Sequence, residues 1–95
     1  MSHFRVALYD LKSGTADEAA ELAGAGMLPI FKSLPGYIRY EVGQLDDGGL
    51  VSFSVWMTST EAQHATVAAS DWVAEHLASR ISLRDEHTGE LYWDE

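Results

Sequence analysis

The chain has 95 residues, of which 46% are hydrophobic and 11% aromatic, so one globular domain over residues 1–95 is expected and a disordered chain is excluded. It contains no cysteine, which excludes disulfides and thiolate metal sites, and its net charge of −9 disfavours binding to nucleic acid or to an anionic membrane. The opening residues show no long apolar run, so we expect neither a signal peptide nor a membrane span and predict a cytoplasmic protein.

The first half of the chain has the pattern of a strand, a capped helix and a second strand. Residues 3–11 alternate in polarity, as a β-strand with two different faces does. Thr15 and Glu18 have the spacing of a capping box, and apolar residues then recur at helical spacing. Pro29 lies within this helix and predicts a kink or two short helices. Residues 37–44 alternate again and predict the second strand.

The second half repeats this order. The Asp-Asp-Gly-Gly segment at 46–49 predicts a hairpin turn that leads into a strand over residues 50–57. A second capping box begins at Thr58, and the helix after it is expected to run to about Arg80. The remaining chain predicts a last strand over 81–84, a turn at 88–89 and a terminal strand or arm over 90–93.

This order predicts an α+β fold, the ferredoxin-like βαββαβ sandwich with a four-stranded antiparallel sheet and both helices on one face. We expect the more apolar sheet face under the helices, with Phe4, Val6, Leu8, Ile38, Val42, Val51, Phe53 and Val55. The opposite face then carries His3, Arg5, Tyr9, Tyr37, Arg39, Glu41 and Trp56. Because no element remains to cover it, we expect a homodimer that packs sheet against sheet; a solvated face is the alternative.

Three residues are candidates for catalysis. His76 lies on the apolar stripe of the second helix, where it is either a general base or a hydrogen-bonded core histidine. His64 shares the polar side of that helix with Glu61, and it either lines a cleft or is solvated. We expect no metal site there, because one helix face splays its side chains outward. Trp56 ends the third strand and either stacks on a flat substrate or packs in the dimer interface.

A substrate pocket is expected between the first helix and the sheet. Gly24, Gly26 and Pro29 weaken that helix, which favours a cavity or a lid beneath it. The expected lining residues are Phe31, Tyr40, Phe53, Trp72 and His76. Arg39, with Arg5 on the same sheet face, either holds a substrate carboxylate or phenolate or neutralises Glu41 inside the dimer interface.

Short segments carry a family resemblance that extends over nearly the whole chain. They are the Leu34-Pro-Gly-Tyr37 entry to the second strand, the hairpin at 46–49, and residues 54–64, which read SVWMTSTEAQH. In the βαββαβ order, these segments resemble the antibiotic biosynthesis monooxygenase-like (ABM) proteins of the dimeric α/β-barrel superfamily. Trp56 and His64 fall where that family has a strand-end aromatic and an early helical His.

The resemblance implies oxygenation of a small molecule without metal or flavin, and haem breakdown in a side branch. Both chemistries typically use an Asn beside the substrate, and this chain contains no asparagine. From the resemblance we expect a monooxygenase-like protein that needs no cofactor and acts on a small, apolar, aromatic molecule. The alternative is a non-catalytic homodimer that binds a ligand or serves as a structural module.

Overall fold

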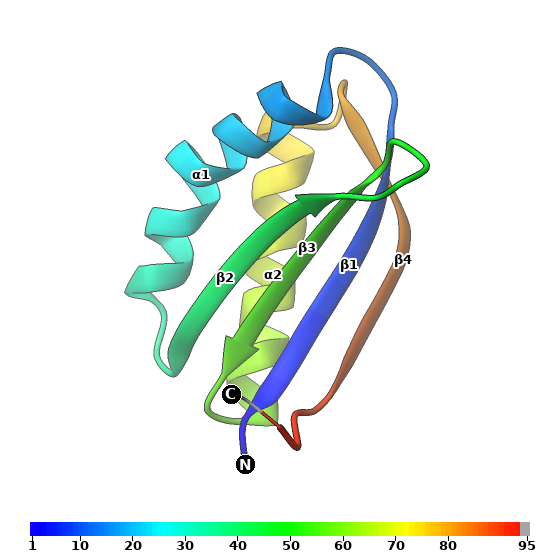
Figure 1. Ribbon diagram of the computed structural model, residues 1–95. Helices are drawn as coiled ribbons and strands as arrows, with labels where there is room; N and C mark the ends of the chain where they lie inside the picture. The colour runs from blue at the N-terminus through cyan, green and yellow to red at the C-terminus, as the bar shows by residue number, and fades with distance from the viewer. Residues whose placement is uncertain (94–95) are drawn as a thin grey trace.

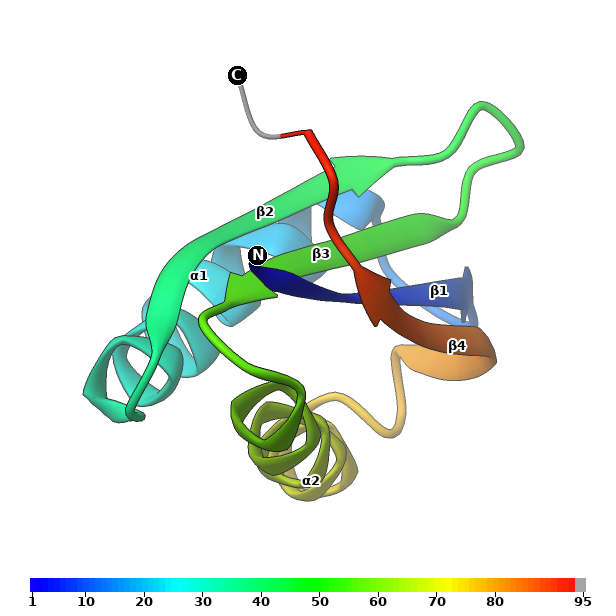
Figure 2. The same cartoon turned by 90° about the horizontal axis from the view of Figure 1, so that it is seen from below.

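The structure, a computed structural model, describes residues 1–93. The elements follow one another as β1 (His3–Leu11), α1 (Ala16–Ser33), β2 (Tyr37–Gln44), β3 (Leu50–Trp56), α2 (Ser59–His76) and β4 (Ile81–Glu90), as Figure 1 shows. The strands pair antiparallel in the order β2-β3-β1-β4. Both helices lie on one side of this sheet (Figure 2), which confirms the predicted ferredoxin-like α+β fold.

Helix α1 begins as predicted but passes its proline without a break. The Thr15 hydroxyl accepts from the Glu18 amide, and the Glu18 carboxylate accepts from the Thr15 amide at 2.9 Å, so the capping box is complete. The predicted division at Pro29 is wrong, because the helix continues to Ser33. The carbonyl that Pro29 leaves without its helical donor belongs to Ala25, which is exposed and therefore open to water.

Strand β4 is longer than predicted. It pairs with β1 from Ile81 to Glu90, with one register shift at Arg84, and the expected turn at residues 88–89 is wrong. Gly89 lies opposite Phe4, and a Cβ there would approach the Phe4 ring at 2.7 Å. Pairing with β1 and the close approach of the Phe4 ring override the local turn tendency of this glycine.

On β1 and β3 the two faces of the sheet are the reverse of the expected ones, whereas on β2 Val42 lies on the helix side and Arg39 on the open face, as expected. On β1, Arg5 is 1% exposed and Ala7 is 0% exposed beneath the helices, while Phe4 and Val6 are half-buried on the opposite side. Alternation along a strand separates the two faces but does not say which of them the helices cover. The prediction that Phe4, Val6 and Leu8 form the helix-side core is therefore wrong.

Small helical side chains explain this choice of face. Helix α2 buries Ala62, Ala65 and Ala69, and short side chains leave room beneath the helix for large ones on the sheet. Trp56 fills part of that room, is 0% exposed and packs edge-on against Phe31 of α1 at 5.2 Å between ring centroids. Trp56 therefore belongs to the helix-side core and not to the open face, which corrects the expected position.

The open face of the sheet is apolar at its centre. Phe4 and Phe53 stack there with ring centroids 5.9 Å apart, and the guanidinium of Arg39 lies 5.9 Å from the Phe53 ring. In Figure 2 the chain leaves β4 on this same side, away from the helices, and Trp93 is 86% exposed. Within residues 1–93, no helix covers this face.

Candidate functional site

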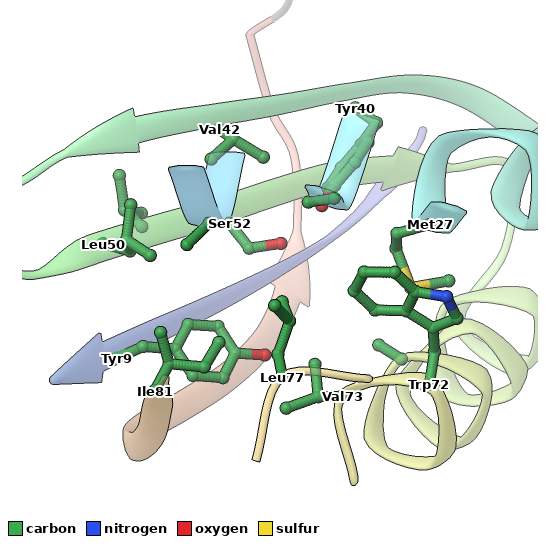
Figure 3. Close-up of a pocket in the computed structure, with 14 residues that line it drawn as sticks. Tyr9, Met27, Tyr40, Val42, Leu50, Ser52, Trp72, Val73, Leu77 and Ile81 are labelled. Atoms are coloured by element: carbon green, nitrogen blue, oxygen red, sulfur yellow. The ribbon is translucent and has the colours of Figure 1, made fainter. Parts of the chain in front are cut away.

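A small apolar cavity lies between the sheet and the two helices, and we call it the central cavity (Figure 3). The sheet contributes Tyr9, Tyr40, Val42, Leu50, Val51, Ser52 and Ile81. The helices and the end of α2 contribute Ala19, Ala23, Met27, Ala69, Trp72, Val73 and Leu77. Its volume of about 30 Å³ has room for only a water molecule or two. An aromatic ligand would therefore require side chains of α1 or α2 to move.

Three hydroxyl groups, those of Tyr9, Tyr40 and Ser52, supply hydrogen-bonding capacity on the sheet side of the cavity. Burial raises the pKa of the Tyr40 phenol, and a hydrogen bond with Ser52 opposes that rise. Tyr40 therefore stays protonated at neutral pH and can donate to a ligand oxygen. The described lining contains no His, Asp, Glu, Lys or Arg. The cavity thus offers neutral donors to a ligand but no charged base.

Trp72 forms the wall between the two helices. Its indole lies flat against the backbone of Gly26, so that a Cβ at Gly26 would overlap the indole Cζ2 atom. This contact requires glycine at position 26 and holds Trp72 beside Met27 at the edge of the cavity (Figure 3). The predicted substrate-binding residues Trp72 and Tyr40 thus both line the cavity.

The other predicted binding residues lie elsewhere. Phe31 is 0% exposed and packs edge-on against the Tyr40 ring at 4.9 Å, so it supports the cavity wall from behind. Phe53 and Arg39 lie together on the open face, across the sheet from the cavity. The expected place of Phe53 in the pocket is wrong because the helices cover the opposite sheet face, whereas Arg39 was expected on the open face and lies there.

The three predicted catalytic side chains do not converge. His76 is the last residue of α2, and its side chain is 54% exposed, 3.6 Å from the Glu75 carboxylate. Its expected place in the cavity is wrong because Leu77, the next residue, takes the buried position. His64 is exposed on α2. Trp56 is fully buried and donates to the Ser54 hydroxyl at 2.9 Å.

Sequence reasoning missed Tyr9 and Ser52 as cavity residues. Both belong to the sheet face that carries Trp56, and that face was expected to form the dimer interface. The signal that could have found them is the alanine spacing of the second helix, since small helical residues pair with large residues on the sheet. Within residues 1–93, no cluster of three His, Asp or Glu side chains could hold a metal ion.

The solved structures that are similar to this chain include oxygenases and a protein assigned to the antibiotic biosynthesis monooxygenases. SnoaB, a cofactor-independent oxygenase from Streptomyces nogalater, is 17% identical; the match covers 98% of this chain and 95% of SnoaB, with a TM-score of 0.75. A Chloroflexus aurantiacus protein assigned to the antibiotic biosynthesis monooxygenases is 17% identical, with 100% and 97% of the two chains covered and a TM-score of 0.68. This chain has the ABM fold.

A third structure extends the comparison to a ligand complex. The ActVA-Orf6 monooxygenase of Streptomyces coelicolor, solved with Nanaomycin D, is 19% identical; the match covers 96% of this chain and 88% of that one, with a TM-score of 0.71. No family model and no curated protein matches the sequence. No helix within the described part of this ABM-fold chain is both long and apolar enough to cross a bilayer.

Proposed function

We propose that this chain is a cofactor-independent ABM-type monooxygenase that acts on a small, apolar, aromatic molecule bound at the central cavity. The observation that carries the proposal is the Tyr40–Ser52 pair, two neutral hydroxyl groups in a lining whose other side chains, apart from Tyr9, are apolar. The oxygenase neighbours SnoaB and ActVA-Orf6 support the reaction class, since they share the fold over nearly the whole chain.

Electron counting narrows the substrate class. Reduction of O₂ to the level of water takes up four electrons, and without a metal, flavin or external reductant all four come from the substrate. A phenol that becomes a quinone supplies them: one ring C–H becomes C=O, the phenolic C–OH becomes the second C=O, and the other oxygen atom leaves as water. Simple hydroxylation supplies only two electrons, so the proposed substrate is a phenol oxidised to a quinone.

The cavity groups suit the charge that this reaction develops. Phenolate donates an electron to O₂ more readily than phenol does. Because the described lining holds no charged base, the substrate must be acidic enough to ionise by itself. The protonated Tyr40 hydroxyl can then donate a hydrogen bond to the substrate oxygen, and such a donor acts strongly in an apolar site.

The proposal includes a homodimer formed through the open sheet face. The Phe4–Phe53 stack at its centre is an apolar surface that no helix of the described chain covers. A second copy of the same face would bury it, since identical faces related by a two-fold axis match each other.

Oxygen uptake with one- to three-ring phenols tests the activity. We expect uptake with one quinone formed per O₂, and a loss of about tenfold or more in kcat/KM for Tyr40→Phe, which removes only the buried donor. Tyr92→Phe is the matched control, because Tyr92 is 71% exposed on the C-terminal arm and its variant should keep full activity. Equal activity of the two variants would contradict the proposed role of the Tyr40 hydroxyl in the reaction.

The small cavity favours a second candidate, a non-catalytic homodimer that binds a ligand. The cavity volume of about 30 Å³ does not admit a ring without rearrangement. Saturable binding of a phenol, followed by quenching of Trp fluorescence and accompanied by no oxygen uptake, would favour this alternative over the oxygenase.

A further inference from the structure

A second and larger hollow lies on the other side of α2, between that helix and strands β1 and β4. We call it the β4 cleft; its volume is about 550 Å³. It shares only Tyr9, Val73 and Ile81 with the central cavity. No residue of α1 lines the β4 cleft, so it is a separate site.

The floor of the β4 cleft holds a buried cation with unmet hydrogen bonds. Arg5 is 1% exposed, and its Nη2 atom donates to Glu86 at 2.7 Å. The Nε and Nη1 atoms of Arg5 are buried and have no hydrogen-bond partner within residues 1–93. Unmet donors on a buried charged group are costly, so an acceptor that meets them would bind with a large gain.

Arg5 stands in a row of polar side chains beneath α2. Ser54 lies opposite it on β3 and Thr88 opposite it on β4. The Ser54 hydroxyl already accepts from Trp56 at 2.9 Å. The acceptor that Arg5 lacks is therefore not provided by its neighbours across the sheet. Because Nε and Nη1 are buried, an acceptor in the β4 cleft reaches them when the Arg5 guanidinium, which lines the cleft, turns toward it.

The charges around the cleft limit what that acceptor can be. Two cations, Arg5 and Lys12, and two acids, Asp71 and Glu86, line it, so its formal charge is zero. A monoanion adds one charge beside Arg5, whereas a phosphate dianion would face both acids. The remaining lining is largely apolar and includes Val67, Ala74, Ala78 and Leu83, which suits a hydrocarbon group.

We propose that the β4 cleft binds a small apolar monocarboxylate, whose carboxylate accepts hydrogen bonds from Arg5. The Glu86 side chain is 28% exposed and contacts Nη2 of Arg5. Glu86 and the ligand carboxylate would therefore bind to the same guanidinium. Because the two hollows have almost separate linings, this site does not depend on the proposed oxygenase function.

Octanoate is the probe, and 1-octanol is the matched neutral control. In ¹H–¹⁵N NMR spectra of the full chain, we expect octanoate to shift the Arg5 Nε–H signal and the amide of Ser70, a cleft residue, with a saturable dependence on concentration. The Nε–H signal should not respond to octanol. Equal responses to the two probes, or octanoate shifts confined to the central-cavity residues Tyr40 and Trp72, would overturn the proposal.

Two variants separate a carboxylate site from a structural ion pair. Glu86→Gln keeps the side-chain shape and removes the resident competitor, so octanoate should bind about threefold tighter or more. Arg5→Met combined with Glu86→Gln removes the buried cation and its half-buried partner together, which protects folding, and octanoate binding should weaken by about tenfold or more. Lys32→Met, on the exposed end of α1, is the control and should bind as the unaltered chain does. Unchanged affinity in the double variant would refute the site.

Discussion

Gly24 and Gly26 lie two residues apart on α1 but have different surroundings. A Cβ at Gly24 would meet no atom within 4 Å, whereas one at Gly26 would overlap the indole of Trp72. The first glycine is a weak point of the helix, and the second is required for close packing of the two helices. Of the two glycines that the sequence associates with a loosened helix, only Gly26 touches a cavity residue.

We predict opposite effects for the two alanine substitutions. Gly24→Ala should stabilise the chain by about 0.5–1 kcal/mol, because alanine favours the helix and meets open space. Gly26→Ala should destabilise it by about 1–3 kcal/mol, because the added methyl group displaces Trp72. Urea denaturation measures both values. The same sign for the two variants would contradict the assigned packing of Trp72.

The chemistry of the Tyr40 hydroxyl also follows from its immediate neighbours. Ser52 forms a hydrogen bond with it that opposes the rise in its pKa, and Phe31 packs against its ring at 4.9 Å. Both contacts fix the phenol in the cavity wall, which is why the comparison of Tyr40→Phe with Tyr92→Phe tests the proposed reaction at a single oxygen atom.

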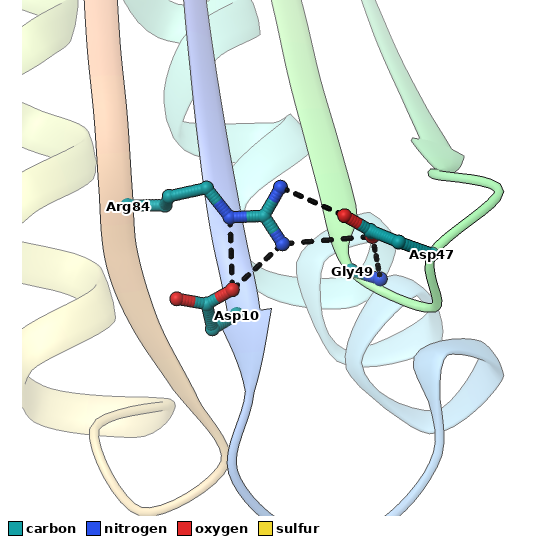
Figure 4. A network of polar contacts seen from close by, with 4 residues as sticks. All are labelled: Asp10, Asp47, Gly49 and Arg84. Atoms are coloured by element: carbon teal, nitrogen blue, oxygen red, sulfur yellow. Dashed lines mark hydrogen bonds and ion pairs between the residues drawn. The ribbon is translucent and has the colours of Figure 1, made fainter.

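At the scale of elements, one arginine ties the β2–β3 hairpin to the neighbouring strands (Figure 4). Arg84 on β4 contacts Asp10 of β1 at 2.6 Å and Asp47 of the hairpin turn at 3.1 Å. The Asp47 carboxylate also accepts from the Gly49 amide at 2.9 Å. Three segments distant in sequence therefore meet at one guanidinium.

This network predicts that the stability of the fold decreases in acid. The Gly49 amide, and after it Arg84, lowers the pKa of Asp47 below its ordinary value. Ionised Asp47 thus stabilises the fold above the unfolded-state pKa of about 4, and this stabilisation is lost as the pH falls through the lower folded-state pKa. In urea titrations between about pH 2 and 6, Asp47→Asn should reduce the acid dependence of stability. Asp46→Asn, in the same turn, is the control and should leave that dependence as it is; equal curves for the two variants would contradict the role of Asp47.

The cap of α1 gives a second prediction at this scale. Thr15→Ala removes a capping box in which both reciprocal hydrogen bonds are present, so it should cost about 1 kcal/mol of unfolding free energy. Thr60→Ala, at an exposed position inside the first turn of α2, should change stability by less than about 0.5 kcal/mol. Circular dichroism at increasing urea concentration measures both. A cap variant as stable as the control would contradict the assigned role of Thr15.

At the scale of the whole molecule, the open face determines the expected assembly. Phe53→Asp places a charge at the centre of that face, so it should convert the proposed dimer to a monomer of the 10.4 kDa chain mass. Leu22→Asp is the matched control, because Leu22 is 40% exposed on α1 and lies on the other side of the molecule. Sedimentation velocity at micromolar concentration distinguishes the two masses. A monomer before any substitution would refute the dimer.

The sequence by itself determined the order of the elements. The patterns that predict these elements are local and depend only on residues near one another in sequence. They are the alternation over residues 3–11, the Thr15–Glu18 cap and the Gly-rich turn at 46–49. With right-handed crossovers, that order leaves few topologies, and the ferredoxin-like one is confirmed. Two of the expected pocket residues, Tyr40 and Trp72, line the central cavity.

Only the tertiary structure decided which face of the sheet the helices cover. A strand alternates identically whichever face is buried, so hydrophobicity alone favoured Phe4 and Phe53 for the core. The alanines of α2 instead accept Arg5, Tyr9 and Trp56, because large side chains on the sheet fill the space that small helical ones leave. That same fit brings Arg5 beneath α2 and places both the central cavity and the β4 cleft on the helix side of the sheet.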